Sequence, residues 1–113
     1  MKSTRYYSDK QETFVAKKLG GRKQINSGAT PFYKGDVIME NVLIECKTTI
    51  TPKLSFSVKK EWLKKLESER ISMRKNYSAL VFGFEPNGNQ YCIISLDLFN
   101  KFIKMEKTLM EEE

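Results

Sequence analysis

The chain has 113 residues, of which 40% are hydrophobic and 30% charged, and its formal net charge is +6. This length and balance fit one folded, soluble domain with a modest core, and they exclude a disordered chain. No apolar run reaches the length of a membrane span, and the first residues lack the apolar core of a signal peptide. We therefore expect a cytoplasmic protein without a membrane partner. The positive charge favours a polyanionic partner, and a basic surface that only maintains solubility is the alternative.

The chain contains no histidine, which excludes several kinds of catalytic site. Ser-His-Asp and Cys-His hydrolysis need an imidazole base, and many metal sites need an imidazole ligand. Cys46 and Cys92 lie in apolar strand patterns, which indicates small core residues rather than a disulfide framework. Any chemistry must therefore come from carboxylates, lysine, hydroxyl groups and a hard metal ion.

The first predicted element is a helix that begins after Ser8 and ends before Gly20-Gly21. Ser8 and Gln11 have the spacing of a capping box, and glycine commonly ends a helix. The apolar stripe of this helix consists of three residues: Val15, Ala16 and Leu19. Glu12 falls on the same stripe. A carboxylate there needs a partner unless it reaches water at the rim, and the pattern leaves both possibilities open.

The segment from residue 22 to residue 33 is polar and contains glycine, which predicts a surface loop or an irregular strand. Four residues in or next to this segment supply hydrogen-bond donors for phosphate groups: Arg22, Lys23, Ser27 and Lys34. These are the candidate residues for binding the phosphates of a polyanionic partner. Asn26-Ser27-Gly28 also has the composition of an ordinary turn, and this alternative stays open.

The central feature of the sequence is a predicted hairpin in which two short apolar runs flank Glu40-Asn41. Asparagine tolerates left-handed backbone angles and suits a tight turn. A turn centred on this pair sets the register of the hairpin: Met39 opposite Val42, Ile38 opposite Leu43, Val37 opposite Ile44, and Asp36 opposite Glu45. Lys47 follows Glu45 by two residues and should therefore point to the same side of the sheet.

The facing carboxylates of Asp36 and Glu45 should repel each other by about 0.2–1 kcal/mol unless a cation lies between them. Mg²⁺ is such a cation, because it binds one or two carboxylates and keeps waters for a substrate phosphate. The alternative is two solvated carboxylates on an exposed hairpin, with Lys47 as a neutralising neighbour. Geometry alone does not choose between these two.

The second half of the chain predicts a helix from Val58 to about Arg70, capped by Ser57. Its apolar face consists of Val58, Trp62, Leu63 and Leu66. Its lysines, which lie mostly on other faces, are either solvated or in contact with nucleic-acid backbone. Two strands, 77–84 and 90–95, then flank a turn at 86–89. A final helix from near Asp97 has a wide apolar face, which either covers the sheet or pairs with another subunit.

This order of elements predicts an α/β fold, a mixed β-sheet flanked by helices, in a single domain over residues 1–113. The order and the residues resemble the restriction-endonuclease-like nucleases, or PD-(D/E)XK superfamily. Their signature is an acid on one strand and acid-x-Lys on the next. Here Asp36 is followed, after eight residues, by Glu45-Cys46-Lys47, and Gly35 replaces the usual proline.

Within this superfamily the layout is most similar to the small Holliday-junction resolvases of archaea and phages, over roughly residues 8–100. Glu12, Arg22 and Ser27-Gly28 match their metal-binding Glu, basic residue and Ser-Gly. The resemblance implies a site for one or two Mg²⁺ ions, with Mn²⁺ as a substitute, built from four groups: the side chains of Glu12, Asp36 and Glu45, and the backbone carbonyl of Cys46. It also implies that Lys47 orients or polarises the attacking water.

The implied function is a Mg²⁺-dependent endodeoxyribonuclease that hydrolyses phosphodiester bonds at four-way junctions during DNA recombination. A homodimer is implied as well, because a twofold axis provides two matched sites for two symmetric cuts. Two alternatives remain. One is a restriction-type or nicking nuclease of the same fold, and the other is a nucleic-acid-binding module without catalysis. The retained Asp36, Glu45 and Lys47 argue against the second alternative.

Overall fold

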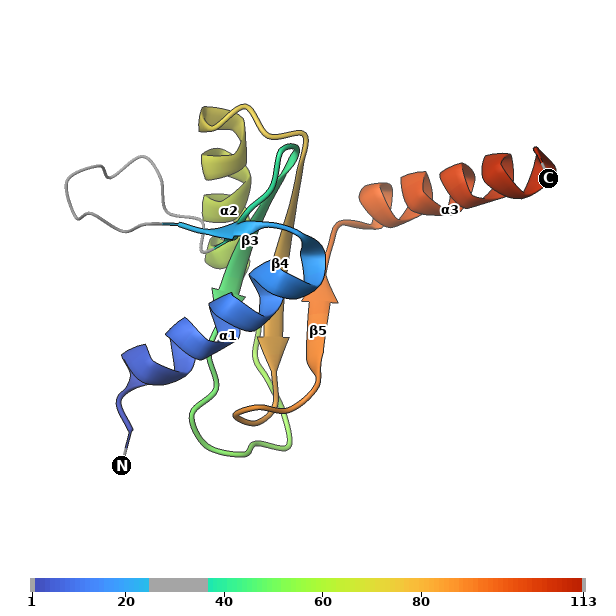
Figure 1. Ribbon diagram of the computed structural model, residues 1–113. Helices are drawn as coiled ribbons and strands as arrows, with labels where there is room; N and C mark the ends of the chain where they lie inside the picture. Colours follow the sequence, from blue (N-terminus) through green and yellow to red (C-terminus); the bar gives the residue numbers. More distant parts are fainter. Residues whose placement is uncertain (1, 25–36, 113) are drawn as a thin grey trace.

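The computed structural model describes residues 2–24 and 37–112, in which two helices cover a five-stranded sheet and a third projects away from it (Figure 1). The elements in chain order are α1 (Thr4–Leu19), β1 (Arg22–Lys23), β2 (Val37–Ile38), β3 (Val42–Lys47), α2 (Lys60–Ser72), β4 (Tyr77–Gly83), β5 (Gln90–Ile93) and α3 (Leu96–Glu111). The strands lie side by side in the order β1-β2-β3-β4-β5. The β3–β4 pair is parallel and the other pairs are antiparallel. The predicted class, an α/β fold with a mixed sheet, is confirmed.

The predicted hairpin forms in the predicted register. Val37 pairs with Ile44 and Ile38 with Leu43. The backbone N–H of Met39 donates to the carbonyl of Val42 at 2.9 Å and closes the turn. Asp36 lies outside the described residues, so its predicted position opposite Glu45 stays a prediction.

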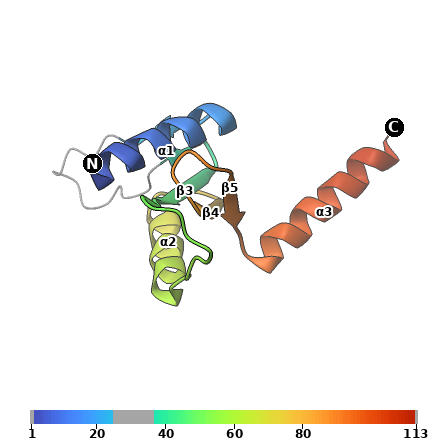
Figure 2. The same cartoon turned by 90° about the horizontal axis from the view of Figure 1, so that it is seen from below.

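The two faces of the sheet carry different helices. α1 covers one face and α2 the other (Figures 1 and 2). The core under α1 consists of Val15, Ala16, Val37, Ile44, Cys46 and Val81. The core under α2 consists of Ile38, Leu43, Leu66 and Leu80. Alternate residues of a strand point to opposite faces, so β3 contributes to both cores. Its parallel partner β4 requires a crossover, which α2 provides.

α1 begins earlier than predicted. Ser3, not Ser8, is its N-cap, and the Ser3 hydroxyl oxygen accepts a hydrogen bond from the Tyr6 N–H at 3.2 Å. Ser8 lies within the helix, where its hydroxyl donates to the carbonyl of Arg5. The predicted end is confirmed, because Gly20 adopts the left-handed conformation with φ of 75°.

α2 also differs from its prediction at its start. It begins at Lys60 rather than Val58, and the preceding residue is extended, so Ser57 does not cap the helix. Of the predicted apolar face, Leu66 is buried and Trp62 is half-buried, whereas Val58 and Leu63 are exposed. Phe56, just before the helix, stacks on Phe82 of β4 with ring centroids 4.3 Å apart.

The predicted antiparallel pair of strands is confirmed as β4 and β5, with Asn87 at φ of 61° in the turn between them. Cys46 is buried as predicted, but Cys92 is exposed, so its assignment to the core is wrong. The reason is the position of Cys92 on β5, which is an edge strand of the sheet. None of the helices in the described ranges is long and apolar enough to span a membrane.

α3 projects away from the sheet, and none of its residues is buried (Figures 1 and 2). Ser95 caps it by accepting a hydrogen bond from the Leu98 N–H at 3.1 Å. Contact with the rest of the chain includes Phe102, whose ring lies 6.4 Å from that of Tyr77. Of the two roles predicted for its apolar face, covering the sheet is therefore wrong.

One partly buried polar residue of α2 stands out. Glu69 belongs to α2 and lies one turn beyond the buried Leu66. Both of its carboxylate oxygens are buried, and neither has a hydrogen-bond partner among residues 2–24 and 37–112. An ionised carboxylate that has left water without a partner costs free energy, so this residue should destabilise the fold.

We expect Glu69→Leu to raise the free energy of unfolding by about 1–3 kcal/mol, because it removes the desolvated carboxylate and keeps the apolar stem. Urea denaturation followed by circular dichroism measures this change. Glu61→Leu, on the exposed first turn of the same helix, is the matched control and should give no gain. A Glu69→Leu variant less stable than the wild type would show that the carboxylate has a partner in solution.

Candidate functional site

The site predicted from the sequence centres on the last residues of β3. Glu45 and Lys47 project from the face that α2 covers, and Cys46 projects from the face that α1 covers. The Lys47 Nζ lies 3.9 Å from the Glu45 Oε1. Only 22% of the Glu45 side chain and 28% of the Lys47 side chain are exposed. This ion pair is therefore largely shielded from water, and its electrostatic attraction is stronger than that of a surface pair.

Trp62 of α2 is a second residue that lies close to the Lys47 ammonium group. The Lys47 Nζ lies 4.2 Å from the centroid of the indole ring, which is within range of a cation–π interaction. The Lys59 Nζ lies farther from the same ring, at 5.7 Å. Trp62 was predicted only as a core residue, because helical spacing shows which face is apolar and not which side chain lies opposite.

Gln11 of α1 ties the end of β3 to two other elements. Its side-chain Nε2 donates to the carbonyl of Lys47 at 2.9 Å and to the Gln90 Oε1 at 2.8 Å. Its Oε1 accepts a hydrogen bond from the Thr48 hydroxyl at 2.9 Å. The next hydroxyl, that of Thr49, donates to the Gly83 carbonyl at 2.6 Å. These bonds anchor the backbone that carries Lys47.

Glu12 does not lie on the same face as the Glu45–Lys47 pair. It is half-buried on α1, whose core residues contact the opposite face of β3. Glu12 and Glu45 could therefore contact a shared ion only at the end of the sheet, where side chains from both faces can reach. Their predicted convergence stays a prediction.

Only some of the predicted metal ligands lie within the described residues. Glu12, Glu45 and Cys46 are described, whereas Asp36 is outside the described ranges. Within residues 2–24 and 37–112, no three acidic or thiol side chains gather into a group that could hold a metal ion. The predicted metal site thus depends on Asp36 for its third carboxylate.

The predicted phosphate donors are divided between the two faces. Ser27 and Lys34 lie outside the described residues. Arg22 pairs with Ile38, a residue of the core under α2, so its side chain projects from the same face as Glu45 and Lys47. Lys23 projects from the opposite face and forms an ion pair with Asp9 of α1. Arg22 is thus better placed than Lys23 to contact a phosphate bound near the Glu45–Lys47 pair.

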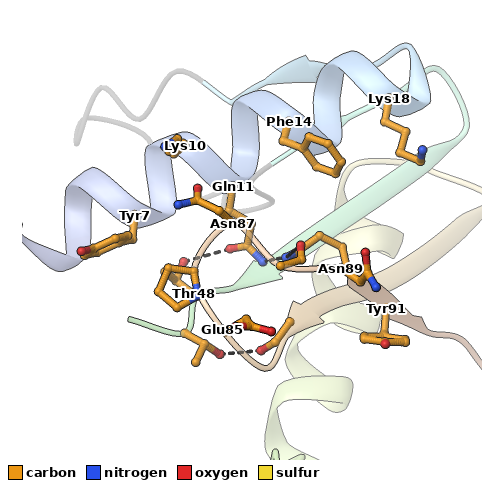
Figure 3. Close-up of a pocket in the computed structure, with 15 residues that line it drawn as sticks. Tyr7, Lys10, Gln11, Phe14, Lys18, Thr48, Glu85, Asn87, Asn89 and Tyr91 are labelled. Atoms are coloured by element: carbon orange, nitrogen blue, oxygen red, sulfur yellow. Dashed lines mark hydrogen bonds between the residues drawn. The ribbon is translucent and has the colours of Figure 1, made fainter. Parts of the chain in front are cut away.

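A groove of about 670 Å³ opens between α1, the end of β3 and the β4–β5 turn (Figure 3). Gln11 and Thr48 lie in its wall, so it adjoins the end of the strand that carries Lys47. Its lining includes the aromatic Tyr7, Phe14 and Tyr91, the cationic Lys10 and Lys18, the acidic Glu85, and the amides of Gln11, Asn87, Asn89 and Gln90. Aromatic rings can stack on bases and lysines can neutralise phosphates, so this lining suits a strand of nucleic acid.

The sequence did not predict this groove, because its walls come from segments far apart in the chain. A capping role was the only one predicted for Gln11, and a turn was the only structure predicted around Asn87. Lysines at helical spacing on α1 gave a weak signal, since Lys10 and Lys18 recur on one helix. That signal is the same for an ordinary solvated face.

No known protein family, curated protein or solved structure matches this chain. The resemblance to the PD-(D/E)XK nucleases therefore stays a prediction that depends on the residues themselves. Of the residues that carry the resemblance, the structure describes Glu12, Arg22 and Glu45-Cys46-Lys47.

Gln11→Ala should lower the free energy of unfolding by about 1–3 kcal/mol, because it leaves the partly buried partners of the amide without their hydrogen bonds. Denaturant titration measures the loss, and hydrogen exchange should show faster opening of Thr48 and Thr49. Lys10→Ala, on the exposed surface of the same helix turn, is the control and should change stability by less than about 0.5 kcal/mol. Equal stability of the two variants would mean that water replaces the Gln11 contacts.

Proposed function

We propose that this chain is a metal-dependent DNA endonuclease of the PD-(D/E)XK type. The observation that carries the proposal is the Glu45–Lys47 pair: a shielded carboxylate and an ammonium group on one face of a central strand, 3.9 Å apart. The hairpin that bears this pair joins Val37 to Ile44 and Ile38 to Leu43, which is the register from which the position of Asp36 opposite Glu45 was predicted. These two groups are the ones that metal-assisted hydrolysis needs where no histidine is present.

The donor set fits a hard cation, because the Glu45 carboxylate offers oxygen ligands in a partly shielded position. Asp36 would complete the site with Glu45, and Glu12 would add a ligand at the end of the sheet. When bound there, Mg²⁺, or Mn²⁺ in its place, supplies a Lewis acid that activates water and stabilises charge on the phosphate.

Lys47 has the most sharply defined role among the described residues. Its ammonium group can donate a hydrogen bond to the attacking water or to a non-bridging phosphate oxygen. Glu45 and Trp62 both contact this group and restrict its motion before the substrate binds. Little further side-chain freedom is therefore lost on binding. Gln11 holds the backbone of the same residue. These contacts fix the position of the Lys47 ammonium group before the substrate binds.

The substrate that we propose is DNA, with the four-way junction as its preferred form and a homodimer as the active species. The net charge of +6, the exposed Arg22 and the lysines of the groove support a polyanion. The preference for junctions and the homodimer rest on the resemblance to resolvases and on the symmetry of two matched cuts.

A second candidate function is binding of nucleic acid without cleavage. The Lys47–Trp62 contact favours it, because packing on a half-buried aromatic ring can explain the position of this lysine without a role in catalysis. In that case the groove and its aromatic rings would carry the affinity. The two functions differ in a single property, the Mg²⁺-dependent breaking of a phosphodiester bond.

Glu45→Gln should abolish Mg²⁺-dependent cleavage and leave the circular dichroism spectrum unchanged, because the amide keeps the shape but is a much weaker cation ligand. Junction, duplex and flap DNA of matched sequence, assayed side by side, measure both activity and preference. Glu40→Gln, in the exposed turn of the same hairpin, should keep full activity. Cleavage that persists in purified Glu45→Gln would refute the site, and a wild type that binds but never cleaves would support the second function.

Lys47→Met should lower the rate of cleavage by about 10²-fold or more while it lowers junction affinity much less, because its proposed role is in the reaction. Single-turnover kinetics and gel-shift titrations separate the two quantities. Lys59→Met is the matched control, since the Lys59 Nζ lies near the same Trp62 ring, at 5.7 Å from its centroid. Equal losses of rate and affinity in Lys47→Met would make Lys47 a phosphate contact instead.

A further inference from the structure

The apolar half of α3 is uncovered in the described chain (Figure 1). We define it by the large apolar residues that are at least 40% exposed: Leu96, Phe99, Phe102, Ile103, Met105, Leu109 and Met110. At a helical repeat of 3.6 residues these side chains share one half of the helix, and the lysines lie on the other half. The helix thus has a strongly amphipathic sequence with few contacts to the described part of its own chain. Those contacts include Tyr77, whose ring lies 6.4 Å from that of Phe102 and 5.2 Å from the Lys101 Nζ.

Such a helix needs a packing partner. A 16-residue helix is only marginally stable in water by itself, and most helical stability comes from an apolar face that is packed. Monomeric proteins rarely expose continuous apolar patches larger than a few hundred Å². At roughly 100 Å² of exposed side chain each, the seven residues present on the order of 700 Å². That is close to the ~800 Å² per partner of a stable protein interface. A seam between two helices would cover the part of this area that Phe102, Met105 and Leu109 present.

The position of Glu106 helps to decide whether the partner of α3 is a lipid surface or a protein. It lies among the apolar residues, and all four positions one turn away from it on the helix are apolar: Phe102, Ile103, Leu109 and Met110. The carboxylate therefore lacks a cationic neighbour on its own helix face. The acyl chains of a lipid surface would supply none either, which disfavours a membrane as the partner.

A second copy of this chain would supply that cation. Leu98, Phe102, Met105 and Leu109 follow each other at spacings of four, three and four residues, which is the seam of a coiled coil. On either side of this seam lie Lys101 and Glu106, five residues apart. In a parallel pair of helices, these are the two flanking positions that form ion pairs between chains.

We propose that α3 pairs in parallel with α3 of a second copy, through the Leu98–Leu109 seam and two symmetric Lys101–Glu106 ion pairs. The inference rests on the surface of α3 alone and is independent of the nuclease activity. It adds to the proposed function by naming the surface through which two cleavage sites would be joined. A dimer without cleavage, or a monomer that cleaves, would separate the two proposals.

Sedimentation equilibrium of the full chain over a range of concentrations tests the surface. The wild type should be a dimer, and Leu109→Lys should weaken the dimer by about tenfold or more, because it places a charge in the seam. Asn100→Lys is the matched control, with the same lysine on the polar half of α3, and should leave the dissociation constant unchanged. Asn100→Lys should keep the wild-type circular dichroism, whereas Leu109→Lys should lose only the helical signal of α3, and only to the extent that the dimer dissociates.

Charge reversal tests the register. Lys101→Glu and Glu106→Lys should each weaken the dimer, and the double variant should be tighter than either single variant. A monomeric wild type at 100 µM, or a dimer that Leu109→Lys does not weaken, overturns the proposal. A monomer that binds phosphatidylcholine vesicles through α3 would assign the surface to lipid instead. A double variant no tighter than the single variants refutes the parallel register.

Discussion

The two-sided burial of β3 is the constraint on which the rest of the structure depends. Its alternate residues pack under α1 and under α2, so this one strand joins both cores. A parallel neighbour on one side and an antiparallel one on the other complete its hydrogen bonding. Burial of both faces explains why the strand is apolar almost throughout. It also explains why its two charged residues come at the end, where the helices no longer cover it fully.

The charged end of β3 is stable only because several segments compensate for the loss of water around it. Moving an ammonium group out of water is costly unless an opposite charge or an aromatic face replaces the solvent. Glu45 and Trp62 both do this for Lys47, and they come from the same strand and from the crossover helix. Gln11 adds a third element by holding the backbone. Structural and chemical roles therefore overlap at this position, and α1, α2 and β3 must all be in place before it forms.

α3 obeys a different constraint from the other two helices. α1 and α2 have buried residues on the sheet, whereas α3 has the strongest separation of apolar and polar residues in the described chain and no buried residue. A helix that packs inside its own domain and a helix that packs on another chain need the same amphipathic pattern. The direction of the chain after β5 decides which kind of packing is possible. Ser95 caps a helix that points away from the edge of the sheet, so α3 cannot pack on the sheet of its own domain.

The sequence by itself determined what depends on neighbouring residues. Apolar pairs around Glu40-Asn41 determined the register of the hairpin, Gly20 ended α1, and the alternation of β3 placed Glu45 and Lys47 on one side. It did not determine the start of α1, because Ser3 and Ser8 are both chemically able to cap a helix. Contacts between distant segments were decided by tertiary structure alone: Gln11 with Lys47 and Gln90, Lys47 with Trp62, and the groove that these elements enclose. The physical reason is that a periodic pattern records which face of an element is apolar, whereas the crossing of α1 and α2 over the sheet decides which side chains meet.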